Sequence, residues 1–326
     1  MDTSREISVI IPTYNRADLL AGAIESLLNQ NARDVTFEVI VVDNNSTDST
    51  RAIVANYVNR SPELVRYVFE PRQGISYARN TGIANAAGNI LAFTDDDIRM
   101  DADWAVKLRD AFLAYPEAVY IGGKVVPIWN EAQPKWAHLQ LGSFAFQDYG
   151  EEAQTVDRDH QRCLVGANLA CRRELVERVG GFEPALQLVK GGIGSMEDHE
   201  WQIRIWEAGF HGMYVPDVQV RTPVQLDRFR KSYHRRWHFR HGRFRSMLRQ
   251  QAMEATSYRI LDTPGHVYRS AIHSLLSFCS ELARGRFQNA FRQECDALDN
   301  LGFILARWQG SLGGQTTRTT SDIGRV

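Results

Sequence analysis

Short apolar runs alternate with stretches of helical periodicity through the first hundred residues of the chain. Ile7–Ile11 is a β-branched run that Pro12 stops, and residues 17–29 then repeat apolar side chains at the spacing of one helix face. The same alternation of expected strands and helices continues through residues 37–42, 49–59, 65–69, 74–87 and 89–93. Strands that alternate with helices form parallel, doubly wound sheets, so the pattern predicts an α/β fold.

The pattern is looser beyond residue 100. Residues 127–161 are an irregular stretch, rich in aromatic residues, that follows an expected strand over 119–126. Loops of this length in compact domains are commonly lids or binding loops, and we interpret this one as part of a binding wall. Farther on, the periodicity over 267–282 and 287–307 predicts two helices that either pack together or form the interface of a homodimer.

Composition narrows the class of protein. The 326 residues carry a net charge of −1 and 44% hydrophobic residues, which argues against a disordered chain and against a nucleic-acid-binding protein. The four cysteines show no metal-ligand spacing and the first residues are polar, so we expect a cytoplasmic protein without a signal peptide. There is no apolar run of about 18 residues, so the protein is expected to contact a membrane only from outside the bilayer, at the inner face of the membrane.

Carboxylates gather where the expected strands end. Asp95, Asp96 and Asp97 follow one apolar strand and Asp43 follows another, at the carboxyl ends where open α/β sheets bind ligands. Adjacent acids repel one another unless a cation neutralises them, and carboxylates suit Mg²⁺ or Mn²⁺, which often also bind nucleotide phosphates. Neighbours in an extended segment face opposite ways, so Asp96 is expected to point into the fold. The alternatives are a solvated acidic turn for the triplet and an Asx turn or helix cap for Asp43.

Four segments in register carry a resemblance to a known family. They are Val9-Ile-Ile-Pro-Thr-Tyr-Asn-Arg16, Val41-Val-Asp-Asn-Asn-Ser-Thr-Asp48, Arg79-Asn-Thr-Gly82 and Phe93-Thr-Asp-Asp-Asp97. In this order and spacing they resemble glycosyltransferase family 2 over about residues 7–225. The resemblance implies a GT-A fold, with a Rossmann-like, mostly parallel central sheet flanked by helices. It also implies transfer of a sugar from a nucleoside diphosphate donor, of the UDP type, with inversion at the anomeric carbon.

The resemblance divides the chain into expected regions. Residues 1–225 form a catalytic domain, in which 1–100 bind the nucleotide sugar and 101–225 bind the acceptor. Residues 226–312 form a basic, mainly helical C-terminal extension, and 313–326 form a disordered tail. The acceptor is expected to be a hydroxyl of a saccharide or of a lipid-linked acceptor, in the synthesis of a bacterial polysaccharide or glycoconjugate.

The matching motifs assign five residues to the nucleotide. Pro12 makes a rigid turn after the first strand, Tyr14 offers a ring that could stack on a base, and Asp43 could accept hydrogen bonds from the base or ribose. Arg79 lies near the start of a helix, where it can face a diphosphate, with a solvated helix face as its alternative. Asp95 is expected to contact the ribose or a metal-bound water.

Acidic residues also have expected roles in catalysis. By resemblance, Asp97 is the direct metal ligand and Asp95 completes the metal site, so the cofactor is Mn²⁺ or Mg²⁺ and neutralises the leaving diphosphate. Inversion needs a base for the attacking hydroxyl, and we assign Asp198, which follows a glycine-rich loop and opens a helix. On the same helix, Glu197 and Trp201 are expected to contact the acceptor, with acidic capping as the alternative reading of the carboxylates.

Two further features concern the end of the catalytic domain. Many relatives carry a histidine after the last core strand, where this chain reads Val220-Arg-Thr-Pro-Val224, and His234 is either its substitute or a packing residue. The range Arg228–Arg249 is basic, with aromatic residues near one helical face. It is expected either to lie on an anionic membrane or to pack against the catalytic domain.

Two other activities fit part of the pattern. A catalytically silent nucleotide-sugar-binding protein would keep Asp43 and the acidic triplet without using a base. A sugar-1-phosphate nucleotidyltransferase would share the sheet, metal and nucleotide, but its glycine-rich signature is replaced here by Pro12-Thr-Tyr-Asn15. Substitution of Asp198 separates an active transferase from the silent protein.

Overall fold

The computed structural model describes residues 5–32, 34–137, 141–186, 196–248, 254 and 258–312. The chain divides into two compact units. Unit 1 comprises Met1–Asn130, Ala145–Lys190 and Glu197–Pro223, and unit 2 comprises Glu131–Phe144, Gly191–Met196 and Val224–Val326. The segment Glu131–Phe144, expected within the catalytic domain, belongs instead with the C-terminal helices.

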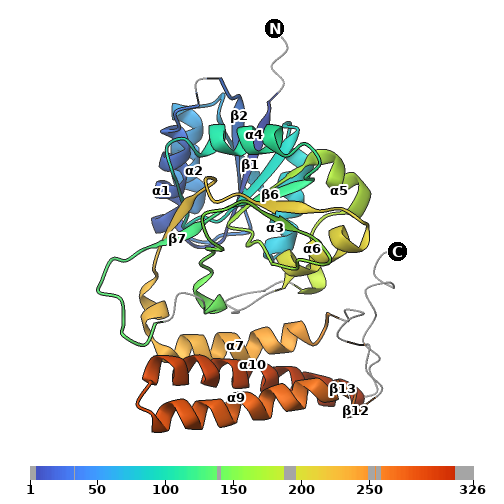
Figure 1. Cartoon of the computed structure of the whole chain (residues 1–326). Coiled ribbons are helices and arrows are strands. Elements are labelled where there is room, and N and C mark those ends of the chain that lie inside the picture. Colours follow the sequence, from blue (N-terminus) through green and yellow to red (C-terminus); the bar gives the residue numbers. More distant parts are fainter. Residues whose placement is uncertain are drawn as a thin grey trace. The chain divides into compact units, whose positions relative to one another are not determined.

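The strands of unit 1 are β1 (Ile7–Thr13), β2 (Phe37–Asp43), β3 (Val65–Phe69), β4 (Ile90–Thr94), β5 (Arg99–Met100), β6 (Tyr120–Gly122), β7 (Val125–Ile128), β8 (Gln154–Val156), β9 (Asn168–Arg172), β10 (Gly212–Tyr214) and β11 (Val220–Pro223). In the described residues they form an eight-stranded sheet in the order β3-β2-β1-β4-β9-β6-β10-β8, and a smaller sheet in the order β5-β11-β7 (Figure 1). The strands β1 to β4 are parallel, whereas β9 is antiparallel to both of its neighbours. The predicted α/β fold with a mostly parallel sheet is confirmed.

Helices of unit 1 connect and flank these strands. They are α1 (Ala17–Leu28), α2 (Thr50–Arg60), α3 (Ile75–Asn85), α4 (Trp104–Ala114), α5 (Arg173–Val179) and α6 (Glu197–Glu207), with the short turn η2 (Pro184–Leu186). Unit 2 contains α7 (Lys231–Arg245), α9 (Gly265–Ala283) and α10 (Phe287–Leu312), the hairpin β12 (Arg259–Ile260) and β13 (Thr263–Pro264), and the turns η1 (Gly142–Phe144) and η3 (Leu226–Phe229).

β1 is a central strand of the sheet. All seven of its residues are buried, as expected for a strand covered on both faces by helices. Contrary to the prediction, Pro12 does not stop the strand but lies within it. β4 pairs with β1 only from Ile7 to Ile10, whereas β2 pairs with it as far as Thr13. Pro12 therefore lies where β1 has a partner on one side only, which is where a strand tolerates a missing N–H.

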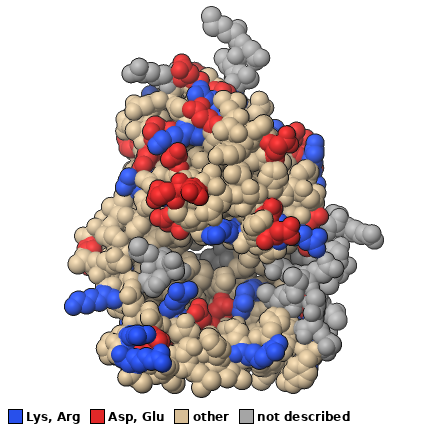
Figure 2. Space-filling model, in the orientation of Figure 1, with Lys and Arg blue, Asp and Glu red and all other residues tan. Residues whose placement is uncertain are grey.

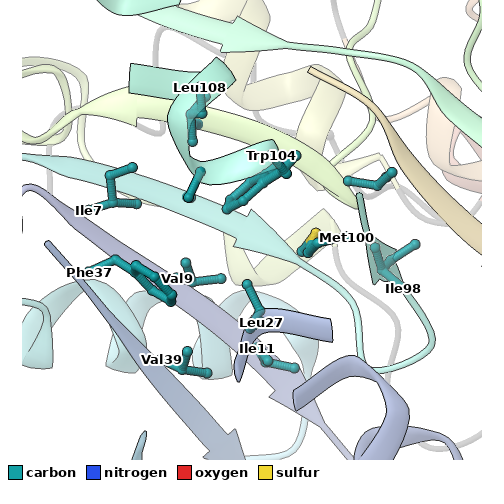
Figure 3. Packing of buried hydrophobic residues seen from close by; sticks show 14 of the residues in the cluster. Ile7, Val9, Ile11, Leu27, Phe37, Val39, Ile98, Met100, Trp104 and Leu108 are labelled. Carbon is teal, nitrogen blue, oxygen red and sulfur yellow. The ribbon is translucent and has the colours of Figure 1, made fainter. Parts of the chain in front are cut away.

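The main core lies on one face of this sheet (Figure 3). Ile7, Val9 and Ile11 alternate along β1 and point to that face, where they join apolar residues of β2, α1 and α4. Trp104 of α4 is also buried there, and its Nε1 donates a hydrogen bond to Asn168 Oδ1 at 3.0 Å. The core therefore contains a large aromatic residue whose polar atom is satisfied.

The other face of β1 positions helix α3. Ile10 points to this face and meets Gly82 of α3, where a Cβ would overlap the Ile10 side chain. Only glycine lets α3 approach the strand this closely, which explains the glycine of the Arg79-Asn-Thr-Gly82 motif. Arg79 lies one turn earlier on α3, so this close packing also fixes its depth beside the sheet.

In unit 2, α10 contacts both α7 and α9 (Figure 1). This confirms that the two predicted C-terminal helices pack together. At the crossing of α7 and α10, a Cβ on Gly242 would overlap the backbone carbonyl of Asp299, and a Cβ on Gly302 would overlap that of Phe239. The two glycines therefore allow the backbones of these helices to lie in close contact.

The buried face of α7 differs from the predicted amphipathic one. Its buried residues are His234, His238 and Gly242, whereas the aromatic Tyr233 and Trp237 are only half-buried. The basic helix therefore packs against α10 with histidine and glycine rather than with its aromatic residues. Among the residues that the structure describes, no helix is long and apolar enough to cross a membrane.

Candidate active site

The acidic triplet lies in the loop after β4, beside the loop after β1. Because β1 and β4 are parallel neighbours, the residues that follow them meet at the same edge of the sheet. Arg16 contacts two of the acids there: its Nη1 lies 3.3 Å from Asp96 Oδ1, and its Nη2 donates a hydrogen bond to Asp97 Oδ2 at 2.7 Å. The guanidinium thus neutralises part of the charge that three successive carboxylates create.

Asp96 lies inside the fold, as does its neighbour Asp97. It is buried, and one of its oxygens accepts a hydrogen bond from Thr13 Oγ1 at 2.8 Å. Burial, together with the neighbouring charges of Asp97 and Asp95, raises the pKa of Asp96 to about 7, although Arg16 opposes the shift. Asp96 therefore ties the triplet to β1. Asp97 is equally buried and is held by Arg16, whereas Asp95 is the most exposed of the three carboxylates.

Arg79 joins the triplet to the start of α6. Its side chain is only 2% exposed, and its guanidinium lies 2.5 Å from Asp198 Oδ1, 3.1 Å from Glu197 Oε1 and 3.4 Å from Asp95 Oδ1. Burial alone would lower the pKa of Arg79, but Asp198, Glu197 and Asp95 together raise it. The structure therefore places Arg79 against three carboxylates, which excludes the alternative of a solvated helix face.

Asp198 is held by two hydrogen bonds. Besides the contact of Oδ1 with Arg79, its Oδ2 accepts a hydrogen bond from the backbone N–H of Gly166 at 2.8 Å. A Cβ at Gly166 would lie 2.5 Å from Arg79 Nη2 and 2.6 Å from Asp198 Oδ1, so a larger residue would push this pair apart. The glycine before β9 is thus a requirement of the site geometry.

The other acids of α6 take part in ion pairs. Glu200 pairs with Arg204 one turn later at 2.6 Å, and Glu197, only 2% exposed, lies against Arg79. Glu197 was expected to contact an acceptor, but its burial beside Arg79 makes it part of the support of Asp198. The acidic start of α6 is therefore mainly an ion-pair network.

Trp201 is a core residue, which corrects the expectation that it packs against an acceptor sugar. It is 0% exposed, and its ring lies at 5.1 Å from Phe182 and 6.1 Å from Phe93, measured between centroids. Its Nε1 donates a hydrogen bond to the carbonyl oxygen of Gly180 at 2.9 Å. Trp201 is one of the buried residues of α6, so its aromatic ring points into the interior of unit 1.

Asn80, next to Arg79, binds the Gly180-Gly181-Phe182 turn. Its side-chain amide donates to the Phe182 carbonyl oxygen at 2.8 Å and accepts from the Phe182 N–H at 2.9 Å. A Cβ at Gly181 would overlap the Asn80 side chain. Two motifs that are about one hundred residues apart in the sequence thus meet directly at the site.

The residues assigned to the nucleoside lie at the ends of β1 and β2. Asp43 is buried at the end of β2, where it accepts hydrogen bonds from the Ser46 N–H and the Tyr67 hydroxyl, both at 2.8 Å. Burial and the bond to Asp43 raise the pKa of Tyr67 to about 12, so its hydroxyl stays a donor. Asp43 thus holds the turn that follows β2 through the Ser46 N–H. Pro12 is buried in β1, and Tyr14, which follows the strand, is half-buried.

The donor set suits a hard cation. Asp95, with 36% of its side chain exposed, and Asp97 offer carboxylate oxygens two residues apart, and phosphate and water oxygens could complete such a site. The described residues contain no ready cluster of three or more His, Cys, Asp or Glu side chains for a metal ion. His234 does not supply a third ligand, since in unit 2 it is a buried packing residue whose Nδ1 lies 2.7 Å from Ser143 Oγ.

Comparison with known proteins agrees with this geometry. Residues 8–180 match the sequence model of glycosyl transferase family 2, which is more than half of the chain. The chain belongs to this family. The matched range includes the loops after β1, β2 and β4 as well as Arg79, Asp95 and Gly166, whereas Glu197 and Asp198 of the ion-pair network lie beyond it.

Family members with named activities extend over most of the chain. The glucosyl-dolichyl phosphate glucuronosyltransferase of Haloferax volcanii is 30% identical over 236 residues, which are 70% of this chain and 72% of the relative. The succinoglycan biosynthesis protein ExoM of Rhizobium meliloti is 27% identical over 298 residues, which are 90% of this chain and 88% of the relative. The second match reaches into the C-terminal helices.

A solved structure supports the fold. The mannosyltransferase PcManGT of Pyrobaculum calidifontis, in complex with GDP-Man and Mn²⁺, aligns with a TM-score of 0.57 at 21% identity. The alignment covers 92% of this chain and 88% of PcManGT. The expected GT-A fold is therefore confirmed.

Two residues of the site received no role from the sequence alone. Arg16 ends the first motif, and the parallel pairing of β1 and β4 could have indicated that it meets the triplet. Gly166 precedes an apolar strand, and glycine beside a strand often marks close approach of another group. Its partner Asp198 is 32 residues away, which no local pattern reveals.

Proposed function

We propose that this protein transfers a sugar, with inversion, from a nucleoside diphosphate donor of the UDP type to a hydroxyl of a saccharide or lipid-linked acceptor. Family membership supports transfer of a glycosyl group. The donor nucleotide, the inverting course and the residue roles go beyond the family relationship, and they rest on the geometry of unit 1.

The observation that carries the proposal is the shared contact of Arg79 with Asp95 and Asp198. One guanidinium lies within 3.4 Å of a triplet carboxylate and 2.5 Å of the carboxylate that opens α6. The acids assigned to the donor diphosphate and to the base therefore border the same site. An inverting transferase needs this proximity, because the base must act next to the sugar that the diphosphate leaves.

Asp198 is the general base of the proposed reaction. The bonds from Gly166 and Arg79 fix the orientation of its carboxylate, and 21% of its side chain remains exposed. It removes the proton of the acceptor hydroxyl as that oxygen bonds to the anomeric carbon and the nucleoside diphosphate departs with the bonding pair. Glu197 and Arg79 then act as positioning residues for Asp198.

Asp95 and Asp97 would hold a divalent cation, Mn²⁺ or Mg²⁺, and PcManGT is a structural relative solved with Mn²⁺. Such a cation supplies charge neutralisation of the departing diphosphate. In this chain Arg16 holds Asp97, and Thr13 and Arg16 hold Asp96, so the loop after β4 is already ordered around its acids. Asp43 and Tyr14 would border the nucleoside at the ends of β2 and β1.

Substitution of Asp198 by asparagine tests the base. Asp198→Asn keeps the shape and the oxygen that can accept from Gly166, so we expect nucleotide binding to survive while turnover falls by about 10² to 10⁴, as for loss of a general base. Asp217→Asn, in an exposed turn of unit 1, is the matched control and should keep full turnover. Unchanged turnover in Asp198→Asn would contradict the assigned role.

Calorimetric titration tests the donor site. UDP, GDP and dTDP are titrated with and without Mn²⁺ into the wild type, Asp97→Asn and the Asp217→Asn control. We expect metal-dependent binding of UDP that Asp97→Asn weakens at least tenfold. Equal binding of UDP with and without Mn²⁺ would refute the cation site, and preference for GDP would refute the UDP assignment while keeping the donor site.

One observation favours the second candidate, a catalytically silent nucleotide-sugar-binding protein. Both oxygens of Asp198 already accept a hydrogen bond, one from Arg79 and one from Gly166, as in a purely structural ion pair. In that case no acceptor screen yields product from a nucleotide sugar that binds tightly. Asp198→Asn would then lower thermal stability without any turnover to lose.

The acceptor class follows from the relatives. The Haloferax volcanii relative is named for a glucosyl-dolichyl phosphate substrate, and ExoM is named for succinoglycan biosynthesis. We therefore propose a lipid-linked saccharide as acceptor and action at a membrane surface, with the basic range 228–249 as one possible contact. In the described part of this range, arginines such as Arg235, Arg236 and Arg240 of α7 are exposed.

A further inference from the structure

Large apolar side chains are concentrated on one part of unit 2. In the part of the chain that the structure describes, eight of the fourteen exposed large hydrophobic side chains lie between residues 258 and 287. They are Tyr258, Ile260, Leu261, Ile272, Leu275, Leu276, Leu282 and Phe287. Single apolar residues are common on protein surfaces, whereas a concentration of this kind marks a contact surface.

α9 carries the centre of this concentration on its outward face. Its inner face packs on α10, where Val267 joins Phe303 and Ile304 in a small core. The outward face carries what we call the α9 stripe. The α9 stripe consists of Ile272, Leu275, Leu276, Cys279 and Leu282, all exposed. Their spacing of three and four residues places them on one side of the helix. Among the described residues, α9 therefore has one apolar face packed on α10 and a second apolar face that is exposed.

The surroundings of the α9 stripe are positively charged. α9 itself contains only two charged residues, Arg269, which is exposed, and Glu281, which is partly buried. Glu281 forms ion pairs with Arg284 at 3.2 Å and Arg286 at 3.7 Å, so its charge is compensated. Figure 2 shows mainly uncharged side chains along the lower rim, where Figure 1 places α9, with Lys and Arg close by. An apolar stripe with arginines around it matches a surface that is both apolar and anionic.

The size of the α9 stripe argues against a second copy of the chain as its partner. A helix of 19 residues is about 28 Å long, and a stripe about 10 Å wide along it covers roughly 300 Å². Stable protein interfaces bury about 800 Å² on each partner. A narrow stripe on a single helix is instead the shape that lies in the plane of a bilayer interface.

We propose that the α9 stripe docks unit 2 on the surface of a membrane that contains anionic lipid. The leucines and isoleucine enter the boundary between headgroups and acyl chains, and Arg269, Arg284 and Arg286 remain at the level of the lipid phosphates. This surface is on α9 and differs from the basic range 228–249, whose helix buries its histidines against α10. The assignment rests on the proposed function only in that a lipid-linked acceptor gives such docking a use.

Co-sedimentation of the full chain with vesicles tests the proposal. The vesicles consist of phosphatidylcholine alone or with about a third phosphatidylglycerol, and no nucleotide sugar is present. We expect binding to the anionic vesicles, weakened at least tenfold in the triple variant Ile272→Gln/Leu275→Gln/Leu276→Gln. These side chains are exposed, and glutamine is a good helix former, so circular dichroism and the melting temperature should match the wild type. Leu113→Gln, on an exposed position of α4, is the matched control and should bind normally.

Each other outcome has a definite meaning. Equal vesicle binding by the wild type and the triple variant overturns the proposal. If Arg235→Gln/Arg236→Gln/Arg240→Gln on α7 abolishes binding while the α9 variant binds fully, the range 228–249 is the membrane contact instead. If sedimentation equilibrium shows a wild-type dimer that the α9 variant dissociates, the occupant is a second copy. Failure of nucleotide binding with normal vesicle binding would refute the proposed function and leave the docking surface intact.

A labelled cysteine gives a second, independent measurement. Cys279 lies in the α9 stripe and is exposed, whereas Cys171 and Cys295 are buried and Cys163 is half-buried. An environment-sensitive fluorophore on Cys279, in a Cys163→Ser background, should shift to shorter wavelength when anionic vesicles are added. A spectrum that vesicles leave unchanged would overturn the proposal even if the protein sediments with them.

Discussion

Acidification should loosen α7 through its two buried histidines. His234 and His238 face the inside of unit 2 and contact a common hydroxyl, since their ring nitrogens lie 2.7 Å and 3.4 Å from Ser143 Oγ. The other nitrogen of His234 lies 2.8 Å from the carbonyl oxygen of Arg228 and must donate to it, so Nδ1 accepts from Ser143. Protonation of Nδ1 would turn the Ser143 hydroxyl from donor to acceptor and would leave a charged imidazolium in a buried site.

The magnitude follows from the two pKa values. Burial lowers the pKa of His234 and of His238 from 6.5 to about 4. Between these two pKa values the unfolded state binds more protons than the folded state. The contribution of each histidine to the free energy of unfolding is therefore fully present above pH 6.5 and is lost as the pH falls toward 4. One pKa unit corresponds to about 1.36 kcal/mol, so at pH 5, about 1.5 units below 6.5, each histidine removes about 2 kcal/mol.

Hydrogen exchange followed by mass spectrometry measures this effect locally. After correction for the intrinsic rate, protection of α7 amides at pH 5 should fall about 30-fold per histidine relative to pH 7.5, because 1.5 pKa units are a factor of about 30. In His238→Gln, one of the two 30-fold decreases in protection should disappear. In His273→Gln, which alters an exposed residue of α9, both decreases should remain. Equal protection of wild-type α7 at both pH values would refute the reasoning.

Three further substitutions test the packing and ion pairs. Gly302→Ala should lower the free energy of unfolding by about 1–3 kcal/mol, because its Cβ would overlap the Phe239 carbonyl oxygen where α10 crosses α7. The control for urea unfolding is Gly209→Ala, where a Cβ has open space but the backbone φ is unfavourable. A larger loss in Gly302→Ala shows that the helix crossing matters more than backbone strain. Trp201→Ala should cost about 3–5 kcal/mol of unfolding free energy, whereas an acceptor-wall residue would change the acceptor KM and leave the melting temperature unchanged. Arg79→Met should cost about 3–5 kcal/mol, because it leaves buried acids without their cation, and a melting temperature equal to that of the wild type would contradict the network.

The sheet could be predicted because its information is local. Each early strand is an apolar run of five to seven residues, and each connecting helix shows its own periodicity, so β1 to β4 and α1 to α3 lie close to their expected ranges. The prediction that Pro12 ends the first strand was wrong for a non-local reason. Whether β1 tolerates the missing N–H of Pro12 depends on where the neighbouring strand β4 ends. A boundary of this kind belongs to the sheet rather than to the strand.

The amphipathic prediction for the basic segment illustrates a different limit. Aromatic side chains and arginines near one face of residues 228–249 indicated a surface helix, but α7 buries histidine and glycine because the close crossing with α10 admits only small or fitted groups. Hydrophobicity alone does not show which side of such a helix is covered. The exposed apolar face lies on α9 instead. Its sequence pattern resembles that of an ordinary packed helix, but α10 covers only one of its faces.

The charged residues that meet in the ion-pair network could be selected from the sequence, but their partners could not. Asp95, Asp198 and Arg79 were each selected for a separate task, at the ribose or a metal-bound water, at the acceptor hydroxyl and at the diphosphate respectively. In the structure they form one ion-pair network across 16 and 119 residues of sequence. A charged residue at the end of a strand or the start of a helix is visible in the sequence. Its counter-charge is set by how closely the elements approach, and here that approach depends on Gly82 against β1 and Gly166 beside Asp198. Glycines that seem to mark only turns therefore determine which acids Arg79 holds, and the position of Asp198 depends on residues that carry no side chain at all.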